Sequence, residues 1–309
     1  EGQKESVSLT LEVKAKNGSA PADQQIGMFF GRLELVGSKL RDDVFLAELS
    51  EVTGDLVVES TELQNLTFSK LKRVGGDLII QSNDVLTEIS LPALEVVGGN
   101  VELALNPSVQ GLERFLESAR TIGGDLKISE NTFGKGRLTV GSSDLEVGAG
   151  VSIDRNTGLR HVDLELLSAG DDIVVLRNKK GEDLQGNEIE DGAEDGAEDH
   201  DSAGDEIEKD FVEDLPAVSA SEEESIRAIN GSFIVQKNGG LETLALRGIN
   251  VVSGTVSVES NEHLEAIDLS GLQHLCTAFQ LNNNLRLGSL SAPRFEAVHG
   301  GLRVQGNRA

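Results

Sequence analysis

One short phrase recurs along the chain at a nearly constant spacing. It consists of a small residue, any residue, an apolar residue, any residue and a second apolar residue, followed by polar residues. Successive phrases start 22 to 25 residues apart, apart from one interval of 60 residues. The first apolar residues of the phrases are Leu33, Leu56, Leu78, Val101, Leu126, Val151, Ile173, Phe233, Val256, Phe279 and Leu302. A fixed period of this length indicates a repeat protein whose units stack, because one unit cannot bury its apolar edge alone.

Each phrase predicts a short β-strand. Apolar side chains alternate with others, as in Leu78 and Ile80, and a period of two puts them on one face of a strand. Glycine precedes the strand in most repeats, for example Gly76 and Gly99, so we expect sharp turns with positive φ there. A second apolar pattern follows in several repeats, at 86–94 for example, and predicts a second buried strand.

Asparagine stands five residues after the first apolar position in nine of the eleven repeats. An inward amide at a tight corner can bond the backbone of neighbouring turns. Asparagine also favours turns for local reasons, but its constant offset favours a structural ladder. The nine residues are Asn83, Asn106, Asn131, Asn156, Asn178, Asn238, Asn261, Asn284 and Asn307, and Ser38 and Thr61 take the other two places.

The fold predicted from these patterns is mainly β, a parallel β-solenoid of about eleven to twelve turns. Residues 1–30 are expected to form an N-terminal turn or cap with an extra rung near Leu9 or Leu11, 31–178 a first solenoid segment, and 229–309 a second segment that continues the stack. Between them, 179–228 form a long acidic insert.

One segment breaks the second apolar pattern. The spacing of Leu112, Phe115 and Leu116 predicts a short helix over 112–121, with these three side chains facing inward.

The acidic insert has the composition of a disordered loop. From Glu188 to Glu224 it holds 17 acidic residues and one basic residue, and such a segment repels itself. Asp199, Asp201 and Asp210 occupy places that resemble a calcium-binding loop. Ala203 cannot supply a side-chain ligand there, so we expect no specific metal site and at most weak divalent-cation binding.

The composition excludes several classes of protein. A net charge of −26 argues against nucleic-acid binding, since phosphate would be repelled. One cysteine, Cys276, excludes an internal disulfide, and we expect it to be a small buried filler. No stretch of 18 apolar residues is present, and no motif indicates a cofactor.

Paired carboxylates at Asp171 and Asp172 are the residues most suggestive of catalysis. Carboxylates act as general acid and base on glycosidic bonds. However, Gly-Asp also precedes the strand at Gly54 and Gly76, so the pair belongs to the turn. We therefore expect no enzyme, and a carbohydrate-active β-helix enzyme is an alternative that the sequence does not favour.

The combined pattern resembles the receptor L domain. The matching runs are 74–83 (VGGDLIIQSN), 86–94 (LTEISLPAL) and 97–103 (VGGNVEL), and the resemblance covers about 31–178 and 229–309. This family is the leucine-rich β-helical module of insulin- and EGF-receptor ectodomains, also found in fungal cell-wall glycoproteins and protist surface proteins. The sequence departs from the animal receptors in having no paired cysteines, so growth-factor binding is not carried over.

The resemblance implies a non-enzymatic module that binds a protein or glycan at a cell surface, at a cell wall or in the extracellular matrix. Sequons at Asn17, Asn65 and Asn230 are candidate glycosylation sites. The alternative is an intracellular leucine-rich-repeat adaptor, which the lone cysteine and a sequon number near that expected by chance also permit.

The outward residues at the middle of the predicted strands form the candidate binding surface. Apolar neighbours that are exposed mark interfaces, although another layer of the same protein could cover them. These residues are Val57, Ile79, Glu102, Lys127, Val174 and Ile234. The last repeat leaves an apolar edge, so we expect further chain or a partner subunit to cover it.

Overall fold

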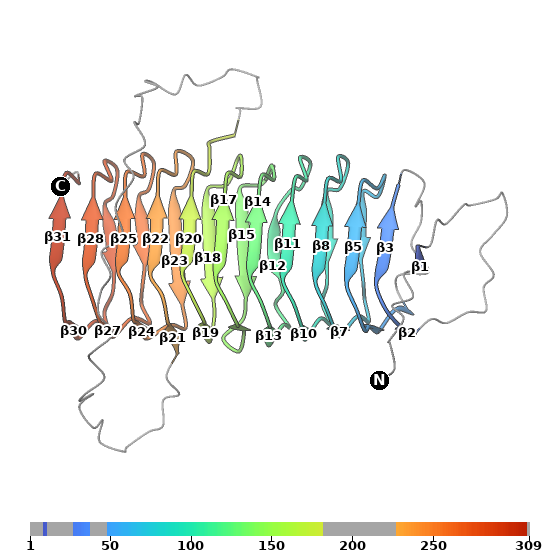
Figure 1. Cartoon of the computed structure of the whole chain (residues 1–309). Coiled ribbons are helices and arrows are strands. Elements are labelled where there is room, and N and C mark those ends of the chain that lie inside the picture. Colours follow the sequence, from blue (N-terminus) through green and yellow to red (C-terminus); the bar gives the residue numbers. More distant parts are fainter. Residues whose placement is uncertain (1–8, 11–26, 38–47, 182–226, 308–309) are drawn as a thin grey trace, which may run out of the picture. The chain divides into compact units, whose positions relative to one another are not determined.

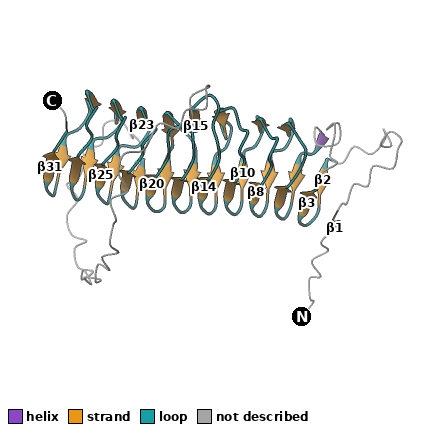
Figure 2. Ribbon diagram, turned by 90° about the horizontal axis from the view of Figure 1, so that it is seen from above, coloured by secondary structure: helices purple, strands orange, loops and turns teal. Residues whose placement is uncertain are grey.

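A computed structural model describes residues 9–10, 27–37, 48–181 and 227–307. These residues form a parallel β-solenoid in which the chain coils repeatedly past three faces (Figure 1). Successive coils lie side by side (Figure 2). The described part contains no α-helix, so the mainly β solenoid predicted from the repeat is confirmed.

Two faces carry long, uninterrupted sheets. The first sheet contains β1 (Leu9–Thr10), β3 (Leu33–Val36), β5 (Leu56–Glu59), β8 (Leu78–Gln81), β11 (Val101–Ala104), β14 (Leu126–Ser129), β17 (Val151–Asp154), β20 (Ile173–Leu176), β22 (Phe233–Gln236), β25 (Val256–Glu259), β28 (Phe279–Asn282) and β31 (Leu302–Gln305). The second sheet contains β2 (Met28–Phe29), β4 (Glu51–Val52), β7 (Arg73–Val74), β10 (Val96–Val97), β13 (Thr121–Ile122), β16 (Glu146–Val147), β19 (Ser168–Ala169), β21 (Ala228–Ile229), β24 (Val251–Val252), β27 (His274–Leu275) and β30 (Ala297–Val298).

The third face is divided. A two-stranded sheet contains β6 (Asn65–Thr67) and β9 (Glu88–Ser90). A six-stranded sheet contains β12 (Leu112–Phe115), β15 (Arg137–Gly141), β18 (His161–Glu165), β23 (Thr243–Arg247), β26 (Ala266–Asp268) and β29 (Ser289–Ser291). β9 and β12 belong to different sheets, so the hydrogen-bonded ladder stops between them.

The stack continues directly across the long interval in the sequence. β20 pairs with β22, and Ile173 lies opposite Phe233. The two predicted solenoid segments therefore share one first sheet. At the other end β1 pairs with β3, with Leu9 opposite Leu33, where the extra rung was expected.

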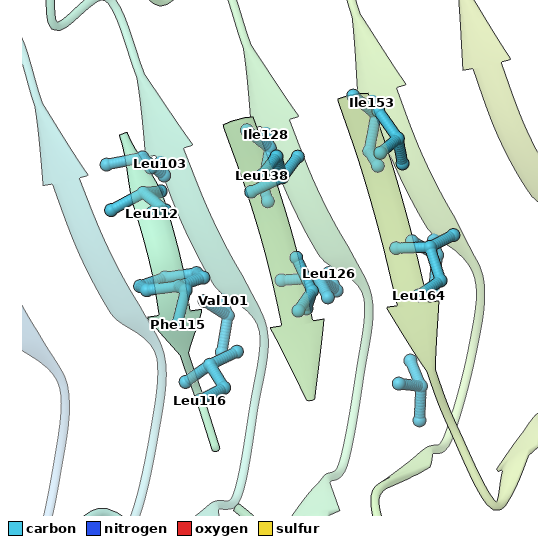
Figure 3. Close-up of a cluster of buried hydrophobic side chains, with 14 of the residues drawn as sticks. Val101, Leu103, Leu112, Phe115, Leu116, Leu126, Ile128, Leu138, Ile153 and Leu164 are labelled. Carbon is cyan, nitrogen blue, oxygen red and sulfur yellow. The ribbon is translucent and has the colours of Figure 1, made fainter. Parts of the chain in front are cut away.

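The core lies between the sheets and is built from inward Leu, Ile, Val and Phe side chains. Leu78, Val101 and Leu126 are adjacent in register and almost fully buried. Figure 3 shows how side chains of the first sheet, such as Leu103, meet side chains of the third face, such as Leu112. Burying one such side chain is worth about 1.5–3 kcal/mol, so neighbouring coils stabilise each other.

The helix predicted over 112–121 is wrong. Its first four residues form β12, which pairs with β15 through a register shift between Leu112 and Phe115. A strand satisfies the backbone groups that β15 offers at its edge, and a helix would leave them unpaired. Leu112, Phe115 and Leu116 do face the core, because the irregular pairing and a φ of 63° at Leu116 turn all three inward.

The positive φ predicted for the glycines before the strands is wrong for most of them, although Gly31, before β3, has a φ of 96°. Gly76 and Gly99 are not among the residues with positive φ. A Cβ on Gly98 would overlap the carbonyl oxygen of Gly75 in the neighbouring coil. The glycines at this corner are therefore required because the coils approach closely there.

The left-handed backbone occurs at the opposite corner instead. The residue before each corner Thr or Asn from position 61 to position 284 has a φ of 50–57°. These residues are Ser60, Ser82, Leu105, Glu130, Arg155, Arg177, Lys237, Ser260 and Asn283. This conformation costs roughly 1–2 kcal/mol for an L-residue, so neighbouring interactions must hold each one in place.

Candidate functional site

The asparagine column forms a continuous hydrogen-bonded ladder at that corner. Asn131 donates from its backbone N and from Nδ2 to Oδ1 of Asn156, at 3.0 and 3.1 Å. Its Nδ2 also donates to the backbone oxygen of Leu103 at 2.9 Å. The same pattern crosses the long interval, where Asn178 donates to Oδ1 of Asn238 at 3.1 and 2.8 Å.

The ladder begins with a hydroxyl and ends at the last described rung. Thr61 donates from N and Oγ1 to Asn83 Oδ1 at 3.0 and 2.7 Å, and Asn284 donates to Asn307 Oδ1 at 2.9 and 3.1 Å. From Asn83 to Asn284 the asparagines are at most 1% exposed. They satisfy buried backbone groups and stabilise the left-handed residues that precede them, so their role is structural.

A second corner lies where the first-sheet strands begin, and it carries an aspartate in several coils. Oδ1 of Asp77 accepts a hydrogen bond from the backbone N of Asn100 at 2.7 Å. In the same way, Asn100 Oδ1 accepts from Asp125 N at 2.8 Å, and Asp125 Oδ1 accepts from Gly150 N at 3.0 Å. A hydrogen bond from Lys127 and the Gly150 N–H lower the pKa of Asp125 below its ordinary value.

Asp172 belongs to this acidic corner. Its Oδ1 accepts a hydrogen bond from Ser232 N at 2.6 Å, while the neighbouring Asp171 is exposed. The Gly-Asp pattern therefore marks a backbone-bonding position of the coil, as the sequence indicated.

The predicted binding surface lies on the outer face of the first sheet. Val57 is in register with Ile79, and Val174 with Ile234. Val57 is only 3% exposed, so it offers almost no accessible surface, whereas Ile79, Val174 and Ile234 are half-buried.

The charged residues of this surface lie between those pairs. Glu102 and Lys127 are adjacent in register. Lys127 is exposed, and its Nζ is 2.9 Å from Asp125 Oδ2. The apolar positions are therefore separated by a charged stretch and do not form one patch.

Several predicted residues lie outside the described part of the chain: Asn17, Ser38, Asp199, Asp201 and Asp210. Within the described residues, no group of three His, Cys, Asp or Glu side chains could hold a metal ion.

Two sequons and the lone cysteine are on the surface. Asn65, on β6, and Asn230, after β21, are exposed. Cys276 is exposed as well, so the expectation of a buried filler is wrong. It lies outside the core because it follows β27 at the corner, where the chain turns toward β28.

Sequence reasoning missed a hollow of about 480 Å³ on the outer face of β15, β18, β23, β26 and β29. At its centre the small Ala245 lies between Asp163 and Asp268 in register. Arg247 Nε is 3.6 Å from Asp163 Oδ1 and 3.7 Å from Asp268 Oδ2. At one edge His161 Nδ1 is hydrogen-bonded to Thr243 Oγ1 at 2.9 Å.

The hollow changes the pKa of one of its carboxyl groups, that of Asp163. Oδ1 of Asp163 is buried and has no hydrogen-bond partner. Burial raises the pKa of Asp163 above its ordinary value, which Arg247 partly opposes and Asp268 reinforces.

A second hollow, of about 540 Å³, lies where the third face divides between β9 and β12. Its lining includes Glu88, Pro92, Arg114 and Lys135. Both hollows are thus on the third face.

No described segment forms a helix with the length and hydropathy required to cross a membrane. Comparison with models of protein families, with curated proteins and with solved structures found no match.

Proposed function

We propose that this chain is a non-enzymatic binding or scaffold module of the receptor L-domain type, which acts at a cell surface, at a cell wall or in the extracellular matrix. The observation that carries the proposal is the first sheet, whose twelve strands stay in register without interruption. Such a sheet is a rigid platform, and repeat proteins use extended surfaces of this kind for binding.

The parts of the platform best suited to a partner lie at β8 and, separately, at β20 and β22. Ile79 on β8 is half-buried on the outer face, as are Val174 and Ile234, which are neighbours in register; exposed apolar neighbours mark interaction sites. Val57 contributes little, because it is already covered.

A photo-crosslinking amino acid placed at Ile79 or Ile234 in cells of the source organism tests this surface. We expect specific adducts from both positions, and none from a matched position at Glu146, which is exposed on the second sheet. Adducts from Glu146 alone, or from none of the three positions, would contradict the proposed binding face.

The proposed location has its own test. Asn65 and Asn230 are exposed, as glycan acceptors must be. We expect the protein on intact cells to be accessible to a membrane-impermeant biotin reagent. We also expect its mobility to shift on deglycosylation, unless Asn17, Asn65 and Asn230 are all changed to Gln. Labelling that occurs only after lysis, with no shift, would favour the intracellular adaptor.

A further inference from the structure

The third face carries a track of small side chains that runs across neighbouring strands. Thr243 on β23, Ala266 on β26 and Ser289 on β29 stand next to one another in register. None of the three is fully buried, and all three line the hollow of about 480 Å³. The hollow extends from β15 to β29, and since adjacent strands lie about 4.8 Å apart, it is roughly 19 Å long.

One side of this track is a wall of charged groups that hold each other in place. Asp268 Oδ1 accepts a hydrogen bond from the backbone N of Ser270 at 3.0 Å, and its Oδ2 lies 3.7 Å from Arg247 Nε. Arg247 Nε also lies 3.6 Å from Asp163 Oδ1, so the space between the two carboxylates is already filled. Groups that are positioned before a ligand arrives lose little freedom when it binds.

The β15 end of the track offers a free hydrogen-bond donor. Arg137 is exposed and in register with His161, and it forms no ion pair with another described residue. His161 is held by its hydrogen bond to Thr243, and its Nε2 lies 4.0 Å from Glu242 Oε2. The track therefore has a guanidinium donor at one end and carboxylate acceptors along one side.

The charge that lines the hollow is balanced. Arg137 and Arg247 offset Asp163 and Asp268, so neither a cation nor an anion is favoured overall. The strands beneath are paired with one another, so an extended peptide cannot add a strand at this place. An apolar ligand would find no anchor either, because the large apolar residues of the lining are at most 2% exposed: Leu138, Val162, Leu244 and Ile267.

We propose that this hollow binds an uncharged oligosaccharide, which lies across the strands over Thr243, Ala266 and Ser289. A hydroxyl group both donates and accepts hydrogen bonds, so a sugar can donate to Asp268 and accept from Arg137. The small side chains of the track leave room for the sugar rings. The inference rests on the proposed role as a binding module, and it adds a second face and a ligand class to that role.

Calorimetric titration of the full chain with neutral hexasaccharides of glucose, mannose, xylose and N-acetylglucosamine tests the site. Each hydrogen bond at a hydrated surface contributes little on balance, so we expect at least one sugar to bind with a Kd of about 1 mM. Ala266→Gln narrows the track and should raise this Kd about tenfold. Arg137→Gln removes the free guanidinium and should raise it about fivefold.

Two matched variants make the same changes at the second sheet. Ala228→Gln, on β21, and Arg120→Gln, next to β13, do not touch the hollow, so we expect each to change Kd by less than about twofold. Circular dichroism checks that every variant is folded. The proposal is overturned if none of the four sugars binds at up to about 10 mM, or if the matched variants weaken binding as much as Ala266→Gln and Arg137→Gln do.

Two charged probes of similar length test the class of ligand. Hexalysine or hexagalacturonate that binds more tightly than the best neutral sugar, with the same dependence on Ala266 and Arg137, would overturn the assignment to an uncharged ligand. Crosslinking at Ile79 and Ile234 reports on the first sheet alone. Failure of the saccharide site is therefore distinguishable from failure of the proposed platform.

Discussion

The first sheet and the third face are built by the same coils but differ in regularity. The first sheet keeps its twelve strands in one ladder, whereas the eight strands of the third face fall into sheets of six and two. Most first-sheet strands begin at the close glycine corner, and most are followed by a buried asparagine. Third-face strands vary from three to five residues. The difference teaches that the corners, and not the strands, fix the repeat of this solenoid.

The largest effect should come from breaking the ladder at its middle. Asn156→Ala would remove the acceptor for two donors of Asn131 and the donors to Ile128 O and Asn178 Oδ1. Each buried group left unpaired costs about 1–3 kcal/mol, so we expect a loss of more than about 3 kcal/mol in the free energy of unfolding. Urea denaturation measures it.

The control for this change is Thr139→Ala, on the outer face of β15. We expect it to alter the free energy of unfolding by less than about 0.5 kcal/mol, as for surface changes in general. Similar losses for both variants would mean that the corner has no special role.

An intermediate effect is expected for glycine at the close corner. Gly98→Ala would push a Cβ into the carbonyl of Gly75 and cost about 1–3 kcal/mol, as overpacking does. Gly111→Ala, which precedes β12, meets its nearest atoms at 3.5 Å and should be tolerated. The melting temperatures of the two variants compare the close glycine corner with the start of a third-face strand. Equal melting temperatures would mean that the close approach of the coils does not restrict the corner to glycine.

The smallest effect should be on the pH dependence of stability, to which Asp125 and Asp163 contribute with opposite sign. The pKa of Asp125 is lowered from 3.8, so its stabilisation is present above that pH and is lost as pH falls through the lowered pKa. The pKa of Asp163 is raised from 3.8, so its contribution is present below that pH and is lost as pH rises through the raised pKa.

We therefore expect Asp125→Asn to lower the melting temperature near pH 7, and Asp163→Asn to raise it slightly. Both differences should shrink as the solution becomes acidic, because the wild-type carboxyls then become neutral as well. Melting temperatures of both variants across this range provide the measurement. Shifts of the same sign near pH 7 would contradict the different environments assigned to the two carboxylates.

Much of the first sheet could be predicted from the sequence, because its signals are local and repeated. The alternation of Leu78 and Ile80 and the constant place of asparagine depend on neighbours along one strand and on a fixed period. The left-handed residues gave no such signal, since Ser82, Leu105 and Arg155 share no side-chain chemistry.

The hollow could not be predicted, because it depends on pairing between distant segments. Asp163 and Ala245 meet only when β18 pairs with β23 across the long interval. Helix and strand were also ambiguous at Leu112, Phe115 and Leu116, whose spacing fits a helix. The unpaired edge of β15 decided in favour of a strand, and that edge is not visible in the segment itself.

The direct pairing of β20 with β22 has a practical consequence. The coil accepts a long additional stretch of chain between Gly181 and Arg227 while Ile173 still lies opposite Phe233. Closing a longer loop costs little, about 0.6 kcal/mol for each doubling of its length. The corner after an asparagine is therefore a natural point for grafting: a reporter, an epitope or a whole foreign domain could be spliced in after another rung, and the scaffold should still assemble around it.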